Sequence, residues 1–81
     1  MSDLEHLIPM NLMHAGQTGL IRQVLGRTEQ VHRLEELGLR GGASVEMVQP
    51  GKPCIIRLGS QTLCFRADEM TAVFVAPQVG S

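Results

Sequence analysis

Glycine and proline divide this chain into apolar stretches of only a few residues, and this spacing excludes any architecture built from long helices. One stretch has a helical repeat, in which apolar residues recur at positions i, i+3 and i+6. Thr28 before the repeat is a good helix N-cap, and Gly38 after it suits the left-handed position that ends a helix. We therefore predict a single helix over about residues 28–37. The repeat consists of Val31, Leu34 and Leu37.

The remaining apolar stretches are typical of short strands. Residues 43–49 alternate in polarity, and the stretch at residues 20–25 alternates less cleanly, which indicates a bulge or burial of both faces. About five strands and one helix predict a mainly β fold, a small barrel that leaves no exposed sheet edge. With 81 residues the chain is expected to form one domain, with its core at about residues 9–76. Other strands are predicted at residues 54–58, 62–67 and 71–76, with a turn at 68–70 and a tail at 77–81.

A hairpin is predicted around Gly59, Ser60 and Gln61. If residues 60 and 61 form a two-residue turn, Leu58 lies opposite Leu63, and Ile56 lies opposite Phe65. This register places the apolar residues of both strands on one face, as a core stripe requires.

The same register separates the two cysteines. Cys54 joins the core stripe, whereas Cys64 lies beside Arg57 on the opposite face. We therefore predict no disulfide within the chain. Two closely spaced cysteines, no signal peptide and no apolar run near 20 residues indicate a cytoplasmic protein without direct membrane insertion.

Composition argues against several classes of function. The net charge is −1 and the basic residues form no run, so nucleic acid is not an expected partner. The only aromatic residues are two phenylalanines, and neither a nucleotide-binding glycine motif nor a supported catalytic triad is present. The chain is therefore predicted not to be an enzyme. Arg33 and Arg40 are candidates for one partner-binding patch near the helix end, although scattered surface arginines are common.

Phe74 is a further candidate for a protein contact. It alternates with Val73 and Val75, so it faces outward if the valines face the core. The alternative is that the N-terminal segment folds over it, with Leu4, Leu7 or Met13 as the cover.

The candidate metal ligands are few. His32 and Glu36 stand at i and i+4 on the outer face of the predicted helix, but zinc in proteins usually takes three or four protein ligands. A solvated surface pair is the simpler interpretation, and His6 and His14 remain unassigned. No cofactor is required. Fe²⁺ or Zn²⁺ at a surface site, or at a site shared between two chains, is the possibility left open.

The order and spacing of the glycines and their neighbours resemble the FeoA family over nearly the whole chain, from about residue 9 to residue 75. The resemblance implies an SH3-like barrel with one helix inserted after the first strand. It also implies a cytoplasmic accessory protein of bacterial ferrous-iron uptake, acting on the FeoB membrane transporter. The family carries no catalytic residues and no fixed metal-ligand motif to transfer to this chain. The matching residues are Gly16, Gly19, Ile21, Gly26, the segment RLEELGLRGG at 33–42, Val45, Met47, Val48, Pro53, Arg57, Leu58, Gly59, Leu63, Phe65, Arg66, Val73 and Val75.

The chain departs from many of these relatives at Cys54, Cys64 and Phe65, where small or aliphatic residues are usual. Our hypothesis from sequence is a regulatory module that docks on the cytosolic domain of a FeoB-like transporter through a barrel face or the corner from Gly38 to Gly42. The alternative is a metal sensor or store with a site between subunits. A homo-oligomer is possible in either case.

Overall fold

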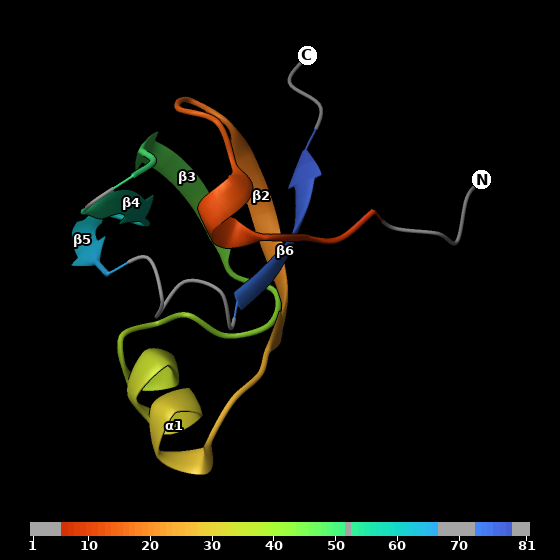
Figure 1. Ribbon diagram of the computed structural model, residues 1–81, viewed down its shortest axis with the longest axis vertical. Coiled ribbons are helices and arrows are strands. Elements are labelled where there is room, and N and C mark those ends of the chain that lie inside the picture. The colour runs from red at the N-terminus through yellow and green to blue at the C-terminus, as the bar shows by residue number, and fades with distance from the viewer. Residues whose placement is uncertain (1–5, 52, 67–72, 79–81) are drawn as a thin grey trace.

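The computed structural model of this chain describes residues 6–51, 53–66 and 73–78. Its strands form one antiparallel sheet of six, in the order β1-β6-β2-β3-β4-β5, and the helix projects from one end of the sheet between β2 and β3 (Figure 1). The prediction of a mainly β fold with one inserted helix is confirmed. The elements are β1 (Ile8–Pro9), the 3-10 helix η1 (Met10–Leu12), β2 (Thr18–Val24), α1 (Thr28–Glu36), β3 (Ser44–Gln49), β4 (Cys54–Leu58), β5 (Gln61–Phe65) and β6 (Val73–Gln78).

Helix α1 lies where the apolar repeat predicted it. Arg27 is the N-cap residue and caps with no side-chain hydrogen bond, so Thr28 is the first helical residue and not the predicted cap. The helix ends through Leu37 into Gly38, whose φ of 104° is the left-handed conformation that glycine adopts without strain. Leu34, in the middle of the repeat, is buried at 3% exposure and joins the helix to the core.

Strand β2 runs through the centre of the sheet, between β6 and β3. Its pairing with β6 shifts between Ile21 and Gln23, and this bulge explains why its apolar residues do not alternate cleanly. On the side that faces β3, the residues before β2 continue the strand pairing: Gly16 N–H donates to Met47 O at 2.7 Å, and Met47 N–H donates to Gln17 O at 2.8 Å.

The N-terminal segment forms a strand that the sequence did not predict. Strand β1 pairs with β6, so that Ile8 lies opposite Val75 and Pro9 lies opposite Phe74. Strand β6 also runs on to residue 78, because Pro77 pairs with a residue of β2; the prediction of a tail from residue 77 was wrong at 77–78. The predicted turn at 68–70 and the end of the tail at 79–81 lie outside the described residues.

The β4–β5 hairpin has a different register from the predicted one. Gly59 and Ser60 form the turn, with φ of 64° at Gly59, so Leu58 pairs with Gln61 and not with Leu63. The slip is two positions, and a slip of two keeps every side chain on its predicted face. Ile56 accordingly pairs with Leu63, and Cys64 lies opposite Ile55 where Arg57 was expected.

The core is formed by residues of strands β2 to β6 together with Met10 of η1 and Leu34 of α1. Cys54 is buried within it, Cys64 is exposed on the other face, and both are free thiols, which confirms the prediction of no disulfide. The described pairings leave β1 and β5 as two edges, so the expectation of a barrel without exposed edges was wrong for these residues. No described helix is long and apolar enough to cross a membrane. The buried residues are Met10, Met13, Ile21, Leu34, Leu39, Val45, Met47, Cys54, Ile56, Leu58, Phe65, Val73 and Val75.

Candidate functional site

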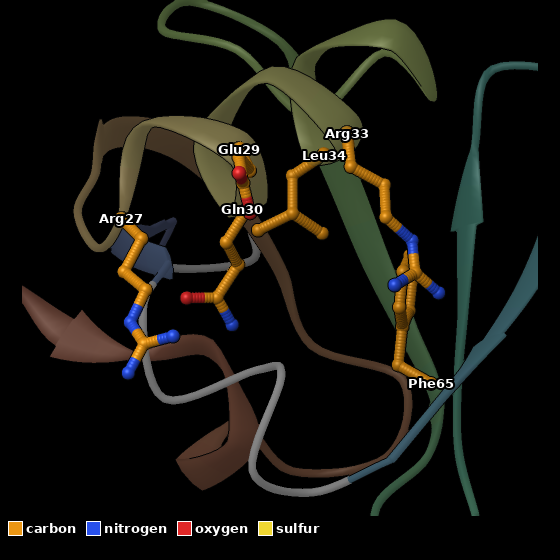
Figure 2. Close-up of a pocket in the computed structure, with 6 residues that line it drawn as sticks. All are labelled: Arg27, Glu29, Gln30, Arg33, Leu34 and Phe65. Carbon is orange, nitrogen blue, oxygen red and sulfur yellow. The ribbon is translucent and has the colours of Figure 1, made fainter.

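A cleft of about 540 Å³ opens between α1 and the end of β5. Its apolar lining is Leu34 and Phe65, which are only 3% and 6% exposed and therefore belong to the core as much as to the surface. The polar lining comes from the first two turns of α1 and the residue before it. Figure 2 shows the six lining residues, which are Arg27, Glu29, Gln30, Arg33, Leu34 and Phe65.

Charges of both signs surround this apolar floor. Arg27 and Arg33 stand on opposite sides of the cleft, with Glu29 and Gln30 between them, and Arg33 extends from the helix toward Phe65 (Figure 2). The helical period explains the arrangement, since residues three and four apart share one face of the helix. A floor that is apolar inside a rim of arginine, carboxylate and amide groups is suited to protein contact, where buried apolar groups supply affinity and rim charges supply specificity.

A further hollow, of about 280 Å³, lies toward the other end of α1 and is called the second hollow below. His32 and Glu36, predicted as a pair, do line it together, along with Glu35 and Arg40. Arg40 donates a hydrogen bond from Nη2 to the main-chain oxygen of Glu35, at 3.2 Å. Within the described residues, no group of three or more histidine, cysteine, aspartate or glutamate side chains could hold a metal ion.

The predicted site residues are thus dispersed over different surfaces. Arg33 lines the first cleft and Arg40 lines the second hollow. Phe74 is half-buried on β6 opposite Pro9, which places the N-terminal strand beside it. His6 and His14 are exposed, and neither lines the hollow that contains His32.

Sequence reasoning did not assign Phe65 to a site. The signal was present, because Phe65 is one of only two aromatic residues in the chain. What the pattern could not supply was the neighbour: Phe65 meets the helix only because the chain from β2 to β3 folds α1 over the end of β5.

Cys54 is a buried thiol whose acidity is lowered by its surroundings. Burial raises the pKa of its thiol, and the nearby charge of Cys64 raises it further. Its Sγ lies 3.8 Å from Sδ of Met47 inside the core. A buried thiol that holds its proton is a weak nucleophile and a poor metal ligand, so the pair acts as core packing.

Comparison with known families gives one clear result. A family model described as the FeoA domain matches residues 8–77, which span every described strand except the last residue of β6. A search of curated protein sequences found no match.

Solved structures show the same fold at low sequence identity. One is a crystal structure of an iron uptake regulatory protein, FeoA, with a TM-score of 0.85 and 23% identity; the alignment covers 90% of this chain and 100% of that one. Another is Stenotrophomonas maltophilia FeoA complexed with zinc, described as an SH3 domain protein, with a TM-score of 0.75, 22% identity, and coverage of 88% and 95%. A manganese-dependent transcriptional repressor matches with a TM-score of 0.84 at 10% identity, over 93% of this chain and 44% of its own.

Proposed function

This chain belongs to the FeoA domain family, and from that membership we propose that it is a non-catalytic, cytoplasmic accessory module of ferrous-iron uptake. The observation that carries the proposal is the family match over residues 8–77, which includes both the sheet and the inserted helix. The partner proposed is the cytosolic domain of a FeoB-like membrane transporter, which is the partner that the resemblance to the FeoA family implies.

The docking surface proposed is the cleft between α1 and β5. Its apolar floor, Leu34 and Phe65, is rigid because both side chains are anchored in the core. Arg27 and Arg33 on the rim favour a partner segment that presents an apolar side chain next to a carboxylate. Binding there regulates transport only if the module has different affinities for two conformations of the transporter.

The test is binding of the purified chain to the transporter's cytosolic domain, measured with GDP and with a GTP analogue. We expect binding to depend on the nucleotide and to fall at least tenfold in Arg33→Glu, because one rim charge is reversed. Arg40→Glu is the matched control, since it makes the same change of charge at the second hollow. Equal loss in both variants would place the contact at the helix corner, and no binding in either nucleotide state would refute the proposal.

A metal-binding role is the second candidate, and the placement of His32 and Glu36 in one hollow is the observation that favours it. Two side chains leave a zinc or ferrous ion short of ligands, so this role needs a second chain to complete the site. Titration with Zn²⁺ or Fe²⁺ should then show binding that is lost in His32→Ala together with any metal-dependent dimer. Binding unchanged in that variant would reject these ligands.

A further inference from the structure

The two edges of the described sheet differ in how well they are protected against pairing. Strand β1 has two residues, and one of them is Pro9, which has no main-chain N–H to donate. Strand β5 has five residues, Gln61–Phe65, with no charge and no proline. Its pairing with β4 runs from end to end without a register shift, unlike the pairings of β2 with β6 and of β3 with β4. Within the described residues, strand β5 therefore carries no charge, proline or bulge of the kind that protects a sheet edge.

The hairpin geometry identifies which main-chain groups face away from β4. A two-residue turn closes on a hydrogen-bonded pair, here Leu58 and Gln61, and hydrogen-bonded pairs then recur at every second position. Gln61, Leu63 and Phe65 consequently direct their N–H and C=O groups toward β4. The N–H and C=O groups of Thr62 and Cys64 point outward, at the open edge.

We propose that β5 pairs antiparallel with β5 of a second copy of this chain, about a two-fold axis at Leu63. In this register Thr62 lies opposite Cys64 of the second copy, so all the outward groups of both residues form hydrogen bonds. Leu63, which is half-buried, meets Leu63 of the second copy on the core side of the sheet. This proposal stands apart from the proposed transporter contact, and either can fail without the other.

The sequence of β5 favours a second copy over an unrelated strand. The segment is neutral, so two copies meet without charge repulsion. The side chains of Thr62 and Cys64, which are exposed on the face of the sheet, are small enough to lie opposite each other in an antiparallel pair. Five residues on each side form less contact than the roughly 1,200 Å² typical of stable interfaces, so the association is weak and depends on concentration.

The first test is nuclear magnetic resonance of the full chain over a concentration series. We expect the amide signals of Thr62 and Cys64 to shift, and their hydrogen exchange to slow several-fold, as the concentration rises. Sedimentation should show dimer growing in parallel. A chain that stays monomeric at millimolar concentration, or shifts that centre on another surface, would overturn the proposal. An unrelated peptide that pairs with β5 while the chain alone does not would overturn the choice of occupant.

Variants at Thr62 test whether the dimer depends on the β5 edge in a chain that still folds. Thr62→Pro removes an N–H that points away from β4, and Thr62→Lys adds a charge at the edge; both should abolish the dimer. Thr62→Lys also guards against the possibility that the proline variant fails to fold. The matched control is Val48→Lys, an exposed site on the interior strand β3, which should leave dimerisation unchanged. A dimer that persists in folded Thr62→Lys would refute the pairing.

A crosslink tests the register. In Thr62→Cys the new thiol lies opposite Cys64 of the second copy, at a Cα separation of about 5.5 Å that a disulfide can span. Oxidised glutathione should therefore convert this variant to a covalent dimer, with the release of reduced glutathione. Wild-type chains should not crosslink, because the two Cys64 residues are offset by two positions. Rapid crosslinking of the wild type would instead indicate an axis at Cys64 and overturn the register.

Discussion

Gly38 lies directly against Leu58, and this contact joins the end of α1 to the β4–β5 hairpin. A Cβ atom built at Gly38 would come within 2.7 Å of Cδ2 of Leu58, closer than real Cβ contacts allow. Gly38 also has φ of 104°, so the position requires glycine for two separate reasons. The end of the helix can pass over the buried Leu58 side chain only because nothing projects from residue 38.

Gly38→Ala should lower the free energy of unfolding by about 2 kcal/mol, from left-handed strain and from displacement of Leu58. Gly42→Ala is the control, because Gly42 has φ of 92° but an added Cβ would meet nothing within 4 Å. This variant should lower the free energy of unfolding by only about 1 kcal/mol. Urea unfolding measures both. Equal losses would show that the contact with Leu58 has no energetic effect, and the variant pair Gly38→Ala with Leu58→Ala would then be additive.

Ile56→Ala should destabilise the chain by about 3 kcal/mol, because Ile56 is fully buried and its truncation leaves a cavity in a small core. Leu12→Ala removes atoms from a side chain that is 59% exposed and should change stability by less than about 0.5 kcal/mol. Thermal and urea unfolding give the comparison. A large loss in Leu12→Ala would mean that this exposed leucine is covered by another chain.

Stability should fall as the pH rises into the alkaline range, because burial raises the pKa of Cys54 above its ordinary value of 9.0. Above that ordinary value the unfolded chain loses the thiol proton while the folded chain retains it, so proton release favours unfolding. One titrating group can change the free energy of unfolding by at most about 1.4 kcal/mol per pH unit. Urea unfolding between neutral and alkaline pH checks it, with Cys54→Ala as the variant in which this component should disappear. The same slope in both would exclude Cys54 as its source.

The cross-strand pair of Glu46 and Arg57 should contribute little. The carboxylate and guanidinium are 3.2 Å apart, but the side chains are 38% and 54% exposed, and water screens such pairs. Glu46→Gln should cost less than about 1 kcal/mol, and added salt should reduce that difference. A loss well above 1 kcal/mol that persists in high salt would contradict this expectation.

The hairpin illustrates how far sequence patterns reach. Alternation of apolar residues correctly placed Cys54, Ile56, Leu58 and Phe65 on the buried face, and Cys64 on the exposed face. It did not yield the correct register, because a slip of two positions keeps every side chain on the same face. The register depends on which residue turns the chain, and Gly59 takes that role with its positive φ.

Local sequence patterns could not predict the first strand or the cleft. Ile8 and Pro9 are too few to show a period, and they form a strand only because β6, far along the chain, presents an edge to them. The cleft likewise joins Phe65 to Arg33 and Leu34 from a distant helix. The predicted partner residues Arg33 and Arg40 line different hollows, Arg33 from α1 itself and Arg40 from the chain that follows the helix.

The sequence by itself determined the helix, most of the strands, the face of the β4–β5 hairpin that is buried, and the family, because these depend on periods and glycine positions within short stretches of chain. Only the tertiary structure decided the strand order, the position of β5 at the edge of the described sheet, and the cleft that Phe65 shares with α1. The physical reason is that these features arise from contacts between distant segments, whose free energy depends on three-dimensional packing and leaves no local pattern.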